Sequence, residues 1–182
     1  MNSRNSGPAS PNSGKRMSPE ARARMRATEK AIYRYYNDMG KNKGNCTWGV
    51  GILAHKGVCS QEELGRKVSA SMVDQEFERR VAEAERYVHI RLTAEVTQEQ
   101  FDALVSLTYN VGVGGMDKTY AFVNRGDFQG AADNISKMIK VTVVENGKKK
   151  LVTARGLIRR REEESAPFRS DTSGSNKRGV DR

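Results

Sequence analysis

Hydrophobic residues recur at helical spacing in several separate stretches of the chain, which predicts a mostly helical protein. The first stretch opens at Ser18 with a capping hydroxyl, followed by a proline and an acid in the first turn. Met25, Ile32 and Tyr36 would then fall on one side of a helix. We therefore expect one helix over residues 18–36.

Two capping boxes, at residues 60–63 and 97–100, predict the starts of two further helical stretches. The first stretch should extend, with or without a break, to about Leu92. The second should end at the VGVGG segment, residues 111–115. The apolar stripe of the first stretch consists of Val73, Phe77, Val81, Ala84 and Val88. Shorter helices are expected at about residues 117–124, 127–139 and 156–165.

A few short segments have the pattern of turns and strands instead. Residues 36–44 contain the Asn, Asp and Gly that are typical of a turn, and residues 47–54 alternate loosely as a strand does. Residues 141–152 read as a hairpin whose turn is Asn146-Gly147. The whole pattern predicts an α+β fold, predominantly α, with a small N-terminal β element.

Composition separates a folded part from two polar tails. Residues 1–17 and 169–182 are rich in small polar and basic side chains, and such segments bury too little apolar surface to offset the entropy of ordering. We therefore predict two disordered tails around one domain, residues 18–168. No apolar run approaches the roughly 20 residues of a membrane-spanning helix, and the N-terminus lacks the apolar core of a signal peptide.

Positive charge dominates the chain, with 32 Lys and Arg against 22 Asp and Glu and a net charge of +10. Such a surplus indicates an anionic partner: nucleic acid, a membrane surface or a charged wall polymer. The basic residues are not interleaved with aromatic side chains in a nucleic-acid motif, so we expect no nucleic acid partner. The basic tails would instead contact the anionic cell-envelope surface, without stable insertion into a membrane.

The stretch EKAIYRYYNDMGKNKGNCTWGVG, residues 29–51, holds candidate catalytic groups. Glu29 and Asp38 are carboxylates on different predicted elements, and Thr47 adds a hydroxyl. Cleavage of a glycosidic bond needs one acid that protonates the leaving oxygen and one ionised carboxylate that handles a water. Taken alone, Glu29 reads more often as a solvated helix residue, Asp38 as a turn former and Thr47 as an ordinary strand residue.

Two cysteines, Cys46 and Cys59, flank a presumed hairpin. The sequence fits either a disulfide or two free thiols. Only His55 and His89 could add imidazole ligands, and no CxxC or HxxxH spacing occurs, so we expect no metal site and no cofactor.

Three segments, in order along the chain, resemble the bacteriophage-type lysozymes, the muramidases that many phages use as endolysins. They are residues 29–51 quoted above, TQEQFDALVSLTYNVGVGG at 97–115 and GLIRRREEESAPF at 156–168. The resemblance implies a lysozyme-like two-lobed fold, with a small N-terminal β element and a larger helical lobe. A long helix would join the lobes, and the glycan would lie in the cleft.

By position, the resemblance implies that Glu29 is the general acid, that Asp38 orients or activates the attacking water, and that Thr47 holds this water. The implied reaction is hydrolysis of the β-1,4 bond between N-acetylmuramic acid and N-acetylglucosamine in peptidoglycan, which lyses bacterial cells. The chain departs from the family pattern at Lys30, where glycine is usual, and at Ile52, where histidine is usual. Its spacing between the Asp and the Thr is also longer.

Other side chains in the matching segments are candidates for supporting roles. Trp48 is either a core residue or a platform on which a sugar stacks. Asn110 and Gly112 end a helix that the resemblance places near the cleft, so they are candidate substrate contacts. The run of arginines at 159–161 is either part of an exposed helix with surface ion pairs or, as the resemblance suggests, a source of one or two inward side chains. We assign this inward role, beside the acids around Glu29, to Arg160.

Two other functions fit the sequence less well. A lytic transglycosylase of the same fold needs a single acid and forms 1,6-anhydro products without water, and Asp38 argues against it. A non-catalytic basic module would bind wall polymer or nucleic acid, and only the net charge supports it.

The expected partner is the glycan strand of peptidoglycan, and the expected state is a monomer. We expect synthesis in the host cytoplasm without a signal peptide, followed by action in the periplasm or cell wall after release or delivery. An endolysin, a virion-associated lysozyme and a secreted antibacterial effector would all share this core.

Overall fold

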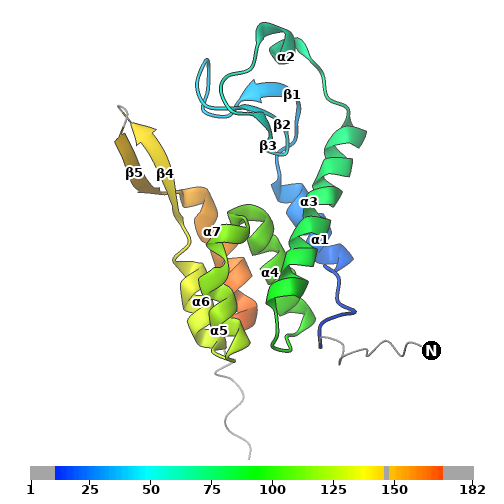
Figure 1. Cartoon of the computed structure of the whole chain (residues 1–182), viewed down its shortest axis with the longest axis vertical. Coiled ribbons are helices and arrows are strands. Elements are labelled where there is room, and N and C mark those ends of the chain that lie inside the picture. The colour runs from blue at the N-terminus through cyan, green and yellow to red at the C-terminus, as the bar shows by residue number, and fades with distance from the viewer. Residues whose placement is uncertain (1–10, 146–147, 170–182) are drawn as a thin grey trace, which may run out of the picture. The chain divides into compact units, whose positions relative to one another are not determined.

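The computed structural model describes residues 11–145 and 148–169, and the chain divides into two compact units (Figure 1). The sheet unit is Met17–Glu85, and the helical unit is Met1–Arg16 together with Arg86–Arg182. Helices and a small sheet make this an α+β protein that is mainly α, which confirms the predicted fold class.

The sheet unit contains a three-stranded antiparallel sheet between helices. Its elements are α1 (Pro19–Thr28), β1 (Ile32–Asn37), β2 (Cys46–Gly49), β3 (Ile52–His55), α2 (Gln61–Gly65) and the first part of α3 (Ala70–Arg91). The helical stretch predicted from residue 60 is therefore broken between α2 and α3, and its capping box is present.

The predicted helix over residues 18–36 is wrong beyond Thr28. Ser18 caps α1 as expected, with its hydroxyl accepting the N–H of Ala21 at 3.2 Å. The helix ends where the Thr28 hydroxyl donates to the carbonyl of Met25 at 2.8 Å, and β1 then begins at Ile32. Strand β1 is rich in Ile and Tyr, which favour a strand, and its backbone pairs with β2. The helical spacing of the apolar residues was coincidental there.

Strand β2 lies at the centre of the sheet, in the order β1-β2-β3. Tyr36 pairs with Thr47 and Asn37 pairs with Cys46, so Asp38 comes directly after the last pair of the β1–β2 ladder. The outer edge of β1 is covered in part by the chain beyond α2, where the Val68 N–H donates to the carbonyl of Tyr33 at 3.0 Å. The sheet therefore places Thr47 on the central strand and Asp38 directly after the neighbouring strand β1.

Ion pairs fasten α1 along α3 within the sheet unit. Arg26 bonds Asp74 through Nη2 at 2.6 Å, and Arg22 contacts Glu85 at 3.1 Å as well as Glu78. The buried Glu85 also accepts the backbone N–H of Met17 at 2.8 Å. These contacts fix α1, the helix that Glu29 directly follows.

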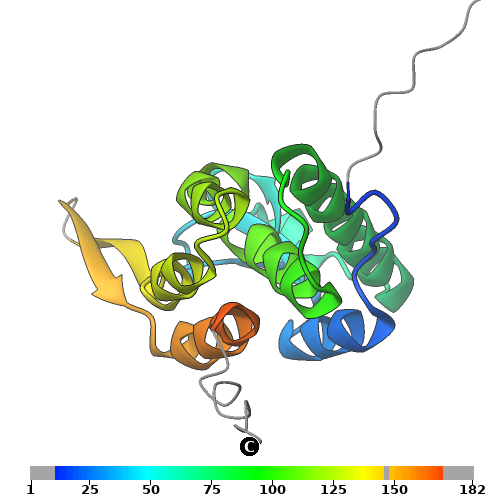
Figure 2. The same cartoon turned by 90° about the horizontal axis from the view of Figure 1, so that it is seen from below.

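The helical unit packs around the apolar face of its longest complete helix, α4. Its elements are α4 (Gln98–Val111), η1 (Val113–Gly115), α5 (Asp117–Asn124), α6 (Phe128–Ser136), β4 (Lys140–Glu145), β5 (Lys148–Thr153), α7 (Arg155–Ser165) and η2 (Ala166–Phe168). The capping box of α4 is present as predicted, and Phe101, Leu104 and Leu107 of α4 are fully buried. Figure 2 shows α7, in orange, beside α6 and α4, which it contacts.

Residues 11–17, which were predicted to belong to a disordered tail, are part of the described structure. Asn12 is buried in the helical unit, where its amide donates to the carbonyl of Ala94 at 2.8 Å and accepts the N–H of Val96 at 3.3 Å. Met17 is buried in the sheet unit. Polar side chains can thus order a segment that offers little apolar surface. Residues 1–10 and 170–182 of the predicted tails, and the predicted turn at Asn146-Gly147, lie outside the described residues.

No helix in the described part of the chain is long and apolar enough to cross a bilayer.

The charged helix α7 turns one arginine, Arg161, into the helical unit, where only 2% of it is exposed. Its guanidinium donates through Nε to the carbonyl of Met138 at 3.0 Å and pairs with Glu164 and Asn110. Glu164 also accepts the hydroxyl of Ser106 at 2.7 Å. These additional hydrogen bonds satisfy both charged groups of the buried Arg161–Glu164 pair, which offsets the cost of removing them from water.

We predict that Arg161→Met destabilises the protein by about 3–5 kcal/mol, because it leaves the buried Glu164 without its main counter-ion. The matched control is Arg159→Met on the same helix, where the side chain is 88% exposed and pairs only across the surface. We expect that control to cost less than about 1 kcal/mol. Urea unfolding of both variants measures the two values, and equal losses would contradict the assignment.

Candidate functional site

Glu29 lies directly after α1 and is half-buried. Its backbone has left the helical conformation, with φ −80° and ψ 102°, while its N–H still donates to the carbonyl of Met25 at 3.2 Å. The α1–α3 ion pairs hold the preceding helix, so Glu29 follows a fixed helix end. A carboxyl group at such a place can serve as a proton donor.

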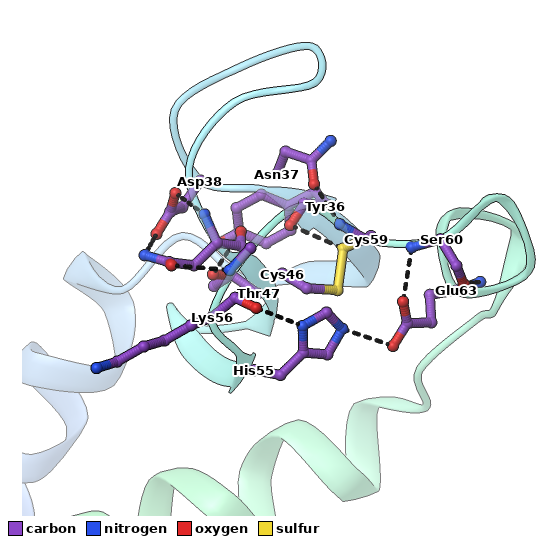
Figure 3. The surroundings of a disulfide bond; sticks show 12 residues. Tyr36, Asn37, Asp38, Cys46, Thr47, His55, Lys56, Cys59, Ser60 and Glu63 are labelled. Atoms are coloured by element: carbon purple, nitrogen blue, oxygen red, sulfur yellow. Dashed lines mark hydrogen bonds and ion pairs between the residues drawn. A yellow bond between two sulfur atoms is a disulfide. The ribbon is translucent and has the colours of Figure 1, made fainter. Parts of the chain in front are cut away.

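Asp38 is exposed and begins the loop of residues 38–45, which joins β1 to β2 (Figure 3). Its Oδ1 accepts the backbone N–H of Asn45 at 2.8 Å, and its Oδ2 accepts the side-chain amide of Asn45 at 3.3 Å. The Asp38 N–H donates in return to the carbonyl of Asn45 at 3.1 Å. Both carboxylate oxygens therefore accept a hydrogen bond from Asn45, which fixes their position.

Gly44 shows how closely this loop approaches the carboxylate. Its φ is +83°, and a Cβ built at this position would lie 2.0 Å from Oδ1 of Asp38. A side chain at this position would therefore require Asp38 to move. The requirement for glycine here follows from the position of the carboxylate.

Thr47 lies in the central strand and is 4% exposed. Its hydroxyl is 3.4 Å from the carbonyl of Asn45, to which it donates. A hydroxyl that donates one hydrogen bond can still accept another from a water. Asn45 thus contacts both Asp38 and Thr47. The sequence does not indicate this role, because an Asn before a strand is typical of an ordinary turn.

Cys46 and Cys59 form a disulfide beside these residues (Figure 3). The sequence left a disulfide or free thiols open, and the structure has the disulfide. The neighbouring backbone is also tied: Cys46 N–H donates to the carbonyl of Gly57 at 2.7 Å, and Cys59 N–H donates to Oδ1 of Asn37 at 2.7 Å. The disulfide therefore fixes the chain next to both Thr47 and Asp38.

A histidine and a glutamate add a polar cluster on the other side of the disulfide. His55 lies with Nε2 2.9 Å from Glu63 and Nδ1 3.0 Å from the carbonyl of Lys56. Both neighbours are acceptors, so the doubly protonated ring makes both hydrogen bonds. The hydrogen bond to the Lys56 carbonyl raises the pKa of His55 most, and the one to Glu63 raises it further. The backbone N–H of Ser60, and then His55, lower the pKa of Glu63.

Cys46, His55 and Glu63 are close enough together to form a metal-ligand set. The sulfur of Cys46 is already bonded in the disulfide, so it offers no thiolate ligand. The arrangement is better described as an ion pair between β3 and α2.

Tyr36 and Trp48 line the strands next to the candidate groups. Burial, and secondarily the charge of Asp38, raises the pKa of the Tyr36 phenol. Trp48 is half-buried, with its ring centre 6.3 Å from that of Tyr35. The part of Trp48 that remains accessible is compatible with the stacking role, which stays a prediction.

The remaining predicted site residues belong to the helical unit. Asn110 is exposed at the end of α4, and its side-chain oxygen accepts from Arg161. Gly112 caps α4 with φ +79° and is exposed. Their predicted contacts with substrate stay predictions.

Arg160 was predicted as the inward arginine, and Arg161 is the one that is almost fully buried. The side chain of Arg160 is 19% exposed, and its Nε lies 3.2 Å from Glu164 on the same helix. Three adjacent arginines face different sides of a helix, so only the helix register decides which of them is buried. The role of Arg160 beside Glu29 stays a prediction.

Comparison with known proteins points to one family. The phage lysozyme family matches residues 26–164, a range that includes Glu29, Asp38 and Thr47. An endolysin of Bacillus phage B103 is 42% identical over 79 residues, which are 42% of this chain and 27% of that endolysin. The chain spans between 27% and 60% of the length of three curated endolysins that it matches.

Solved structures support the same fold. An endolysin from Escherichia coli O157:H7 phage FAHEc1 is similar with a TM-score of 0.67 and 29% identity, covering 85% of this chain and 94% of that one. The muramidase domain of SpmX from Asticaccaulis excentricus has a TM-score of 0.65 at 23% identity, covering 85% and 97%. The second likeness concerns the fold alone.

We predict that reducing the Cys46–Cys59 disulfide lowers the free energy of unfolding by about 3 kcal/mol, because the bond closes a short loop in the unfolded chain. Urea unfolding with and without a reductant measures this difference. The control is the double variant Cys46→Ala and Cys59→Ala, which should unfold at the lower urea concentration and should not respond to reductant. An unfolding midpoint of the wild type that reductant leaves unchanged would contradict the prediction.

Proposed function

Because the chain belongs to the phage lysozyme family, we propose that it is a muramidase that degrades peptidoglycan. The substrate is the β-1,4 bond between N-acetylmuramic acid and N-acetylglucosamine in the glycan strand. The observation that carries the proposal is the hydrogen-bonded Asp38 carboxylate, which is held by two donors in the same unit as Glu29. A family match that includes both carboxylates supports it further.

In the proposed mechanism, Glu29 donates its proton to the glycosidic oxygen as the bond to the departing sugar breaks. Asp38 stays ionised and takes a proton from the water that attacks the sugar carbon from the opposite face. Thr47, whose hydroxyl still has acceptor capacity, orients this water. The reaction needs only these proton transfers, and water supplies the oxygen of the new hydroxyl.

The proposed mechanism requires room for a water between the carboxyl groups of Glu29 and Asp38. Enzymes that invert the configuration at the sugar carbon have carboxyl groups about 6.5–9.5 Å apart, whereas retaining enzymes have them about 5 Å apart. We propose the wider spacing, since Glu29 follows a helix and Asp38 begins a separate loop.

The biological setting follows from the substrate. The enzyme would act on the cell wall, reached from the periplasm or from outside after release or delivery. Contact of the basic tails with the anionic envelope and a monomeric state are part of the proposal. Its role as an endolysin, a virion-associated lysozyme or a secreted effector depends on this delivery.

We predict that Glu29→Gln lowers the rate of glycan cleavage at least about 100-fold, because the amide cannot donate the proton in the rate-limiting step. Release of soluble fragments from purified sacculi measures the rate. The matched control is Glu20→Gln, which changes an exposed carboxyl at the other end of the same helix and should keep full activity.

Mass spectrometry of the same digest identifies the chemistry. Hydrolysis gives fragments that contain an added water, whereas a transglycosylase gives 1,6-anhydro ends that are lighter by one water. Full activity in Glu29→Gln would refute the assignment of the acid, and anhydro products would refute hydrolysis.

A further inference from the structure

Asn45 makes more hydrogen bonds around the candidate site than closing a turn requires. Its backbone N–H and side-chain amide both donate to Asp38, at 2.8 and 3.3 Å. Its carbonyl accepts the N–H of Asp38 at 3.1 Å and the hydroxyl of Thr47 at 3.4 Å. Its side-chain oxygen accepts the N–H of Gly57 at 3.2 Å. One residue thus connects the carboxylate, the hydroxyl and the turn after β3.

The two donors of Asn45 reach different oxygens of Asp38, so together they set the plane of the carboxylate. An ionised carboxylate has about four acceptor positions, and two of these remain for a water. A single contact would leave the group free to rotate about its last bond, whereas two contacts at separate oxygens restrict that rotation.

The position of Asn45 is itself determined by its neighbours. Gly44 allows the loop to approach the Asp38 oxygen, and the next residue, Cys46, is fixed by the disulfide. The contact with Gly57 orients the side-chain amide, because the oxygen faces that N–H and the nitrogen faces Asp38. An aspartate side chain would offer no donor to Asp38, and an alanine side chain would offer neither a donor nor an acceptor, while the backbone N–H of residue 45 would remain in both.

We propose that Asn45 is a positioning residue for the glycan-cleaving reaction: it orients Asp38 and Thr47 toward the attacking water. This inference rests on the proposed function. Asn45 acts through these two residues and does not itself touch the reacting atoms. Its removal should slow the chemical step and leave substrate binding nearly unchanged.

The most informative variant is Asn45→Asp, which keeps the size of the side chain and the acceptor for Gly57. It replaces the donor that faces Asp38 with a second negative charge, which disfavours the ionised form of Asp38. The matched control is Asn42→Asp, which adds the same charge at an exposed position of the same loop. Tyr36 also lies near Asp38, and its raised pKa keeps the phenol neutral at the acidic pH values tested.

The assay measures kcat, KM and the pH profile on a soluble oligomer of alternating N-acetylglucosamine and N-acetylmuramic acid. In Asn45→Asp, kcat should fall about 10–100-fold with KM within about twofold, and the acid limb of the profile should move to higher pH. Asn45→Ala should lower kcat by a similar factor and move that limb less than Asn45→Asp does, since it removes one donor but adds no charge. Asn42→Asp should match the wild type in all three.

The possible results distinguish a failure of this inference from a failure of the proposed function. A wild type that releases no fragments overturns the proposed function. An active wild type together with an Asn45→Asp variant whose kcat and pH profile match those of Asn42→Asp overturns the role of Asn45. If Asn45→Asp fails to fold by circular dichroism, Asn45→Ala decides: unchanged kcat in folded protein contradicts the proposal, and a lower kcat at constant KM supports it.

Discussion

The hydrogen bonds between Asp38 and Asn45 are the interaction on which the candidate site depends. They close the loop between β1 and β2, and they do so with the carboxylate that the mechanism requires. The same carboxylate lies against the position that only Gly44 can occupy without a displacement. The contact between Asp38 and Asn45 therefore serves both the local fold and the chemistry. A change that loosens the loop also misplaces Asp38, the proposed base.

The surrounding structure stabilises this contact from two sides. The disulfide joins the residue before Thr47 to the chain after β3, and the bond from Cys59 to Asn37 ties the same segment to the end of β1. Arginines of α1 fasten that helix to α3, which fixes the point from which Glu29 projects. The Arg26–Asp74 pair lies at the surface, where ion pairs are individually weak, but together with the pair to the buried Glu85 it restricts the position of the helix.

The sequence was sufficient for the fold class, the capping boxes and the family, because helical spacing and capping hydroxyls are local signals. It was insufficient at residues 29–37, where an Ile- and Tyr-rich segment has apolar residues at helical spacing yet pairs as a strand. Pairing with a strand that lies further along the chain decides such a segment, and a local pattern cannot show that pairing. Contacts with distant parts of the chain also decide the role of Asn45 and which arginine is buried. The local sequence therefore did not indicate Asn45, and it did not show that Arg161 is the arginine that is almost fully buried.

The central claim is that Asp38 acts on a water and does not attack the sugar itself. Proton NMR of the freshly formed reducing end, recorded before the sugar anomers equilibrate, tests it most directly. A direct attack by water on a β-linked sugar gives the α-anomer first, and the account predicts that result. The β-anomer as the first product would show a covalent or retaining path and would contradict it.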